Sequence, residues 1–172
     1  MKKTRKIALF GLLTALCFGL SYIEFLIPFT SLGVPGIKMG LANLCVMAAL
    51  YLAGLPEAAA VSLIRIILSW LIFGSFSGFL YSLAGGVLSL GLMAVLKKCE
   101  LFSPVGVSAA GGAAHNVGQI AVAMILTETP ALWYYLPILL LSGVAAGAVN
   151  GIILTVILAR LKGRNERIFD NE

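Results

Sequence analysis

Two ionisable residues stand inside long apolar segments of this sequence, Arg65 and His115. Such groups are costly at membrane depth, and they usually face a cavity or a transport pathway. A guanidinium donates two parallel hydrogen bonds, so Arg65 suits the carboxylate or phosphate group of a ligand. The two residues therefore predict a site for a negatively charged or strongly polar small molecule.

Other polar residues accompany these two. Ser69 follows Arg65 by one helical turn, and Gln119 follows His115 at the same spacing, so each pair shares a helix face. Glycines on either side of His115 leave room for a bound group. We predict an outward-opening pocket, whose candidate ligand-binding residues are Arg65, His115, Asn116, Gln119, Asn43, Lys38, Ser69 and Glu24.

The same residues also allow structural roles, in which they bind no ligand. Arg65 could pair with Glu24 or with backbone carbonyls and lock a helix bundle, and His115 could be a core residue with satisfied hydrogen bonds. The amides could be contacts between helices, worth only about 0.6 kcal/mol each on average. Asn150 is assigned to packing.

Catalytic and metal-binding motifs are not found. The sequence has no P-loop, no H-E-x-x-H and no paired-carboxylate site. Its three cysteines, Cys17, Cys45 and Cys99, lack metal-ligand spacing and accompany a single histidine, so we interpret them as packing residues. We predict no catalytic residue, no metal and no cofactor.

The composition indicates that these residues are held by membrane helices. Of 172 residues, 60% are hydrophobic and 11% charged, with a mean hydropathy of +1.05, whereas soluble domains carry about 25% charged residues. A hydrocarbon core of about 30 Å needs ~20 apolar residues per helix. We predict one all-α membrane domain over residues 1–172, with six transmembrane helices at 7–27, 38–53, 57–73, 79–96, 105–126 and 134–161. A loop at 28–37, turns at 54–56 and 74–78, and loops at 97–104 and 127–133 would join them.

The basic residues predict the orientation. Ten of the twelve Lys and Arg residues lie in clusters at 2–6, 97–98 and 160–167. By the positive-inside rule, both termini and the 97–98 region are cytoplasmic, in a multi-pass protein of a bacterial cytoplasmic membrane. Because these charges flank apolar segments, lipid headgroups explain the net charge of +5, and no nucleic-acid partner is predicted.

Small residues recur every four positions at Gly11, Ala15 and Gly19, and again at Gly143, Gly147 and Gly151. Such stripes let two helix backbones approach closely. They serve either packing within this protein or docking of another membrane subunit, and the pattern alone does not choose.

Three segments carry a family resemblance: GIKMGLAN (36–43), RIILSWLIFG (65–74) and GGAAHNVGQ (111–119). They resemble the Gx transporter family, also called heptaprenyl diphosphate synthase component I. In size, helix number and the stripe at 11–19, the chain is also similar to substrate-binding S components of energy-coupling-factor transporters.

The two resemblances imply different functions. An S component would bind a solute from outside under a lid at 28–37, and would dock through Gly11, Ala15 and Gly19 on a membrane coupling subunit with cytoplasmic ATPases. A component I would be a non-catalytic membrane partner of a prenyl synthase catalytic subunit in menaquinone side-chain synthesis, because the sequence has no D-D-x-x-D motif. Under either function, a ligand related to isoprenoids, quinones or flavins would suit the predicted pocket. We expect the transporter subunit, with component I as the alternative and a purely structural membrane subunit as a third class.

Overall fold

Every secondary-structure element in the part of the chain that the structure describes is a helix. The computed structural model describes residues 3–26 and 40–169, and at residues 3, 5, 6 and 163–169 it describes the backbone alone. The elements are α1 (Lys3–Leu26), α2 (Leu41–Leu52), α3 (Leu55–Phe73), α4 (Phe76–Cys99), α5 (Pro104–Thr127), the 3-10 helix η2 (Pro130–Tyr135) and α6 (Leu136–Phe169). The predicted all-α bundle of six α-helices is confirmed.

Proline and serine residues set helix starts. Pro104 occupies the first turn of α5, where its missing N–H leaves no hydrogen bond unmade. The Ser75 side chain accepts a hydrogen bond from the Gly78 N–H at 3.1 Å and caps α4. Because of this cap, α4 begins at Phe76 and the predicted turn over 74–78 is too long.

Other predicted boundaries are wrong in extent. The predicted loop over 97–104 is shorter, since α4 continues through Lys97 and Lys98 to Cys99; basic residues are favourable in the last turn of a helix because they face its negative end. The predicted loop over 127–133 contains the start of η2, and α6 continues beyond residue 161.

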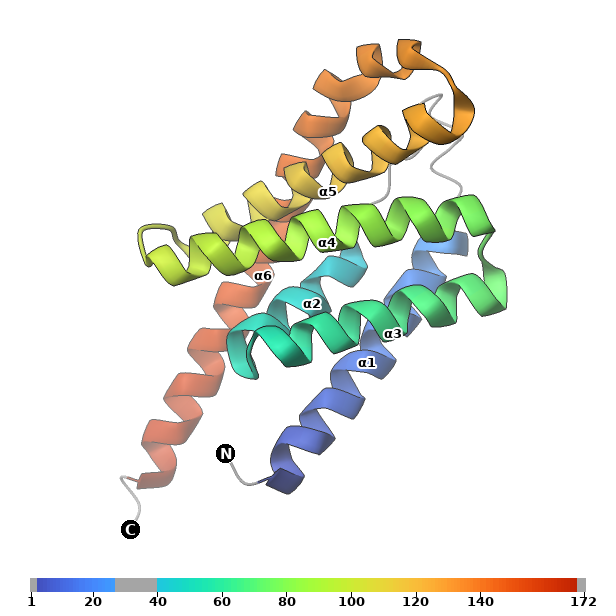
Figure 1. Cartoon of the computed structure of the whole chain (residues 1–172). Helices are drawn as coiled ribbons and strands as arrows, with labels where there is room; N and C mark the ends of the chain where they lie inside the picture. Colours follow the sequence, from blue (N-terminus) through green and yellow to red (C-terminus); the bar gives the residue numbers. More distant parts are fainter. Residues whose placement is uncertain (1–2, 27–39, 170–172) are drawn as a thin grey trace.

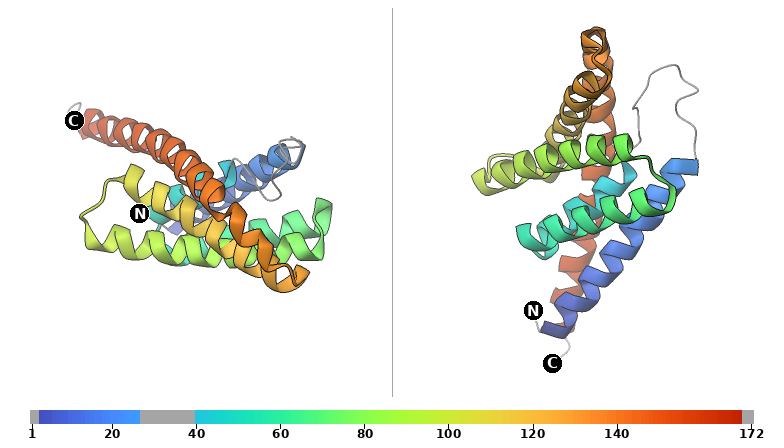
Figure 2. Two further views of the ribbon diagram at one scale, coloured as in Figure 1. Left: turned by 90° about the horizontal axis from the view of Figure 1, so that it is seen from above. Right: turned by 45° about the vertical axis from the view of Figure 1, so that its right-hand side comes forward.

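The helices form two groups of three that pack against each other. In the first group α1, α2 and α3 are in mutual contact, and in the second α5 packs against both α4 and α6. Contacts of α3 with α4 and of α2 with α4 and α6 join the groups. The start of α1 and the end of α6 lie at the same end of the molecule (Figure 1, Figure 2). The side of the membrane that this end faces stays a prediction.

Glycines bring α4, α5 and α6 close together. A Cβ added at Gly112 would lie 2.1 Å from the carbonyl oxygen of Gly143, and one at Gly147 would lie 2.3 Å from that of Ser108. One at Gly118 would lie 2.8 Å from the carbonyl oxygen of Ala84. These three helices therefore pack backbone against backbone, as membrane helices do where small residues meet.

The helix α2 is short and lies at the centre of the molecule. Its 12 residues span about 18 Å at 1.5 Å per residue, and most of its side chains are buried. At its C-terminal end, the Lys97 Nζ donates a hydrogen bond to the Leu50 carbonyl oxygen at 2.6 Å and lies 4.8 Å from the centroid of the Tyr51 ring. The Lys97 side chain of α4 thereby holds the C-terminal end of α2.

Five of the described helices are long and apolar enough to cross a membrane: Ile7–Leu26 within α1, then α3, α4, α5 and the segment Pro130–Lys162. The helix predicted over 38–53 is shorter in the structure, where α2 runs from Leu41 to Leu52. Gly40 precedes it with a φ of 68° and is not helical. The protein is thus a multi-pass membrane protein with a short central helix.

Candidate functional site

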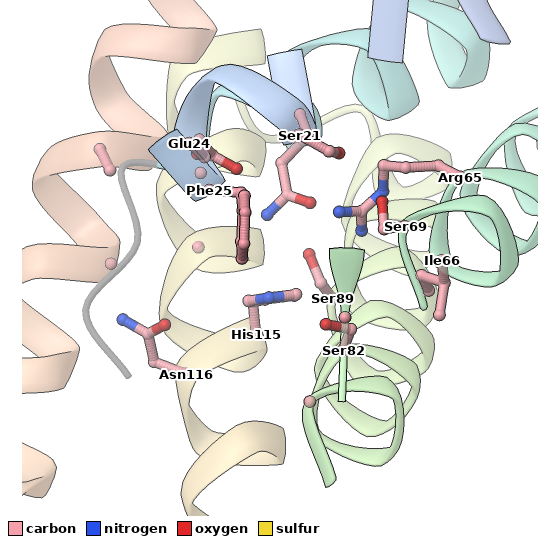
Figure 3. Close-up of a pocket in the computed structure, with 18 of the residues that line it drawn as sticks. Ser21, Glu24, Phe25, Arg65, Ile66, Ser69, Ser82, Ser89, His115 and Asn116 are labelled. Carbon is pink, nitrogen blue, oxygen red and sulfur yellow. The ribbon is translucent and has the colours of Figure 1, made fainter. Parts of the chain in front are cut away.

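A cavity of about 360 Å³ lies between the two groups of helices, and all six α-helices contribute to its wall. This volume falls within the range of about 300–1,000 Å³ that is usual for small-molecule sites. Figure 3 shows side chains that line it. Its wall is polar in the middle of the bundle and aromatic toward the C-terminal ends of α1 and α3.

Arg65 enters the cavity from α3 (Figure 3) and is only 8% exposed. Its Nε and Nη2 atoms are buried and donate to no atom of the described residues. A buried charge without partners costs several kcal/mol, and each unmet donor costs roughly 1–3 kcal/mol. The guanidinium therefore lies in the protein interior with two of its three nitrogens unbonded to the described residues.

Serine hydroxyls surround this guanidinium. Ser69, one turn after Arg65 on α3, and Ser89 on α4 both line the cavity, and within the described chain the buried Oγ of each has no hydrogen-bond partner. Ser75, Ser82 and Ser89 lie seven residues apart and all line the cavity, because two helical turns return to one face. Ser82 and Ser89 are not among the residues predicted from the sequence, although their seven-residue spacing is a signal that the sequence carries.

His115 faces the same cavity from α5, on the wall opposite α3 (Figure 3). A Cβ added at Gly85 of α4 would lie 2.9 Å from both Nδ1 and Cε1 of the imidazole. The absence of a side chain at Gly85 thus makes the room that the ring occupies. Arg65 and His115 share one cavity, while their role in binding a ligand stays a prediction.

The two amides that follow His115 have different positions. Asn116 lines the cavity, but its Nδ2 donates a hydrogen bond to the Leu139 carbonyl oxygen of α6 at 2.5 Å, so it also joins two helices. Gln119 is buried at 9% exposure and does not line the cavity. The structure therefore does not bring Gln119 together with the other candidate residues.

The start of α2 opens into the cavity. Glu24 and Asn43 both line it, and the Glu24 Oε1 accepts a hydrogen bond from the Leu41 N–H at 2.6 Å. A carboxylate is favourable at a helix N-terminus because the helix dipole is positive there. The Glu24 carboxylate is thus committed to the first turn of α2, and the predicted residue Lys38 lies outside the described part of the chain.

Asn150 of α6 is a wall residue that the sequence analysis assigned to packing alone. Its Nδ2 donates a hydrogen bond to the Gly40 carbonyl oxygen at 2.8 Å, and its side chain lines the cavity. The bond joins α6 to the residue before α2. No sequence signal distinguished this asparagine, because its partner is 110 positions away.

Aromatic rings form one end of the cavity wall: Phe25 from α1, Trp70 and Phe73 from α3, and Phe79 from α4. The centroids of Phe25 and Phe73 are 4.9 Å apart, and those of Trp70 and Phe79 are 5.1 Å apart. Such distances are those of interacting ring pairs. The rings were not predicted as site residues, although Trp70 and Phe73 follow Ser69 directly and by one turn.

The two stripes of small residues face different surroundings. Gly11, Ala15 and Gly19 of α1 are all exposed, and a Cβ added at either glycine would meet nothing within 4 Å. The stripe of α6 packs against α5, with Gly147 next to the Ser108 backbone. Packing within this protein therefore explains the stripe of α6 and does not explain that of α1.

Within the described residues, no three or more His, Cys, Asp and Glu side chains are placed to hold a metal ion. Cys17 and Cys45 are buried, in keeping with a packing role, whereas Cys99 is exposed. The interpretation of Cys99 as a packing residue is therefore wrong, because α4 carries it beyond the packed part of the bundle.

Comparison with known proteins gives one match. No curated protein and no solved structure matches the chain. The model of one family, described as heptaprenyl diphosphate synthase component I, matches residues 13–157. This range begins in α1, ends in α6 and includes the whole described wall of the cavity. The chain, with its six helices around one polar cavity, therefore belongs to the heptaprenyl diphosphate synthase component I family, as the three sequence segments predicted.

Proposed function

We propose that this protein is the substrate-binding membrane subunit of a small-molecule transporter, and that its ligand is a polar or anionic compound bound in the central cavity. Arg65 holds the anionic group, and His115, Asn116 and Asn43 orient the remainder. The protein itself catalyses no reaction in this proposal.

The observation that carries the proposal is the buried Arg65 guanidinium on the wall of a cavity. Had it served only to lock the helices, its donors would be used by neighbouring carbonyls or by a carboxylate. Instead Nε and Nη2 have no partner among the described residues, and two serine hydroxyls on the same cavity are in the same condition. Polar groups gathered on one cavity without protein partners suit a polar ligand, which would complete their hydrogen bonds.

Native mass spectrometry of the protein released from lipid nanodiscs tests the proposal. We expect a small molecule retained by the wild-type protein and lost from Arg65→Ala. Arg160→Ala is the matched control, since Arg160 is exposed near the end of α6, away from the cavity. Equal retention of the small molecule by Arg65→Ala and Arg160→Ala would contradict the proposal. A wild-type protein that retains no molecule and shows no saturable binding of any added small molecule would also contradict it.

A transporter of this kind needs a partner that supplies energy, and the exposed stripe of α1 supports a docking role. We propose that Gly11, Ala15 and Gly19 contact a membrane coupling subunit that carries cytoplasmic ATPases. Gly11→Leu combined with Ala15→Leu should abolish co-purification of that complex while leaving ligand retention intact. Loss of ligand together with the partner would indicate misfolding instead.

The second candidate function comes from the family description. As a component I in the literal sense, the protein would be a non-catalytic membrane partner of a heptaprenyl diphosphate synthase. This alternative predicts co-purification with a soluble prenyl synthase and a change in the chain length of its product when the membrane protein is added. Neither effect is expected of the transporter subunit.

A further inference from the structure

The distribution of charge, hydroxyls and rings over the cavity wall identifies a narrower class of ligand. This inference rests on the proposed function, since it assumes that the cavity binds a small molecule. We infer that the ligand is a small monoanion with a planar, largely apolar ring system, and that it is not a prenyl diphosphate.

The charge of the wall favours a single anionic group. Among the described lining residues, Arg65 is the sole Lys or Arg. The N-terminus of α2 adds a partial positive charge, but the Glu24 carboxylate already accepts a hydrogen bond there. One guanidinium fork matches one carboxylate or one singly charged phosphate oxygen pair. A diphosphate carries more negative charge than one guanidinium neutralises.

The hydroxyls locate the anionic group. Ser69 lies one turn from Arg65 on the same helix, and Ser89 lies on the facing helix α4 (Figure 3). In the described chain, the buried atoms without hydrogen-bond partners include Nε and Nη2 of Arg65 and the Oγ atoms of both serines. A carboxylate among these groups accepts from the guanidinium and from both hydroxyls, so it completes all of them at once.

The aromatic wall lies at a fitting distance from this polar site. Phe73 is eight residues after Arg65 on α3, which is about 12 Å along a helix, and Trp70 lies between them. With Phe25 and Phe79, these rings offer faces and edges to a flat apolar body. A molecule that reaches from the guanidinium to the rings therefore needs an anionic end and a planar end separated by no more than about 12 Å.

The volume excludes a long chain inside the cavity. The cavity volume of about 360 Å³ lies near the lower end of the range of about 300–1,000 Å³ that is usual for small-molecule sites, so it suits a compact molecule and not a heptaprenyl chain. A prenyl tail along α4 would also cover the Ser82 and Ser89 hydroxyls with hydrocarbon and leave them without partners, which is unfavourable.

Titration of protein in lipid nanodiscs with four probes tests the inference: 2-naphthoate, its neutral amide 2-naphthamide, the aliphatic carboxylate decanoate, and geranyl diphosphate. The chain has two tryptophans, and Trp133 is 59% exposed near the start of α6. In the Trp133→Phe protein, the fluorescence of Trp70 on the cavity wall therefore reports binding. Nanodiscs without protein correct for partition of the probes into lipid.

We expect saturable binding of 2-naphthoate, and binding of 2-naphthamide weaker by roughly 10- to 100-fold, the value of hydrogen bonds to a charged group. Arg65→Gln should weaken the binding of 2-naphthoate by the same factor and leave the binding of 2-naphthamide unchanged. The reason is that the carboxylate and the guanidinium act as a pair. Phe73→Leu should weaken 2-naphthoate by about 2- to 10-fold and leave decanoate unchanged.

The outcomes separate this inference from the proposed function. Binding of decanoate or geranyl diphosphate that depends on Arg65, without binding of 2-naphthoate, would overturn the ligand class and keep the binding function. A retained native molecule that is aliphatic or multiply charged would do the same, and a retained aromatic monoanion would support the class. If no probe binds and no molecule is retained through Arg65, both proposals fall.

Discussion

Replacement of Arg65 by methionine should make the empty protein more stable while it removes ligand binding. The guanidinium is 8% exposed, and its Nε and Nη2 have no partner among the described residues. Two donors without a protein partner cost at most about 2–6 kcal/mol in the folded state, at roughly 1–3 kcal/mol each, because water in a polar cavity offsets part of the penalty. Methionine fills part of the same volume with an apolar, adaptable side chain, so we take the lower bound of about 2 kcal/mol as the expected gain.

The gain can be read from thermal unfolding in detergent. For a chain of this length, 1 kcal/mol corresponds to roughly 2–4 °C in Tm, so Arg65→Met should raise Tm by about 4–8 °C. A thiol-reactive dye reports unfolding when Cys17 and Cys45 become accessible, because they are 0% and 5% exposed in the folded protein. Cys99→Ala removes the exposed thiol that would otherwise react before unfolding.

Two control variants are compared with Arg65→Met. Arg160→Met removes an exposed cation away from the cavity and should leave Tm nearly unchanged, since most surface substitutions stay within about 0.5 kcal/mol. Asn150→Leu removes a satisfied cavity residue, which donates to the Gly40 carbonyl oxygen, and should lower Tm by about 2–4 °C for a loss near 1 kcal/mol. If Arg65→Met lowers Tm as Asn150→Leu does, Arg65 is a structural residue and the reasoning from its unmet donors is wrong.

Three further outcomes are expected. Gly147→Leu should abolish folding or lower Tm sharply, because its Cβ would lie 2.3 Å from a backbone oxygen, whereas Gly19→Leu should leave Tm unchanged, since nothing lies within 4 Å; equal Tm values would contradict the close packing of α5 and α6. Lys97→Met should lower Tm by about 2–6 °C through loss of the 2.6 Å bond to α2, and Lys98→Met, which removes an exposed side chain, should not; a comparable drop in both would show that Lys97 does not hold α2. Cys99 should react with a membrane-impermeant maleimide only after the cells are permeabilised, because positive charges beside it predict a cytoplasmic position, and labelling of intact cells would reverse the orientation.

The polar cavity shows where interpretation of the sequence succeeded and where it could not. Arg65, Ser69, His115, Asn116, Asn43 and Glu24 were selected because polar groups in apolar helices are rare and costly, and all six line the cavity. Ser69 and Gln119 were both selected by helical spacing, from Arg65 and His115, yet Ser69 lines the cavity and Gln119 does not. Helical spacing defines a face only approximately, and the crossing of neighbouring helices decides which part of that face borders a void.

The sequence by itself determined that the chain is a helical membrane protein of this family, because hydropathy, charge clusters and short motifs are local properties. Helix ends such as Ser75 and Pro104 are likewise set by neighbouring residues. Only the tertiary structure decided that Asn150 meets Gly40, that the Glu24 carboxylate caps α2, and that serines and rings from different helices share one wall. These are contacts between distant segments, and they depend on helix crossings that no local pattern records.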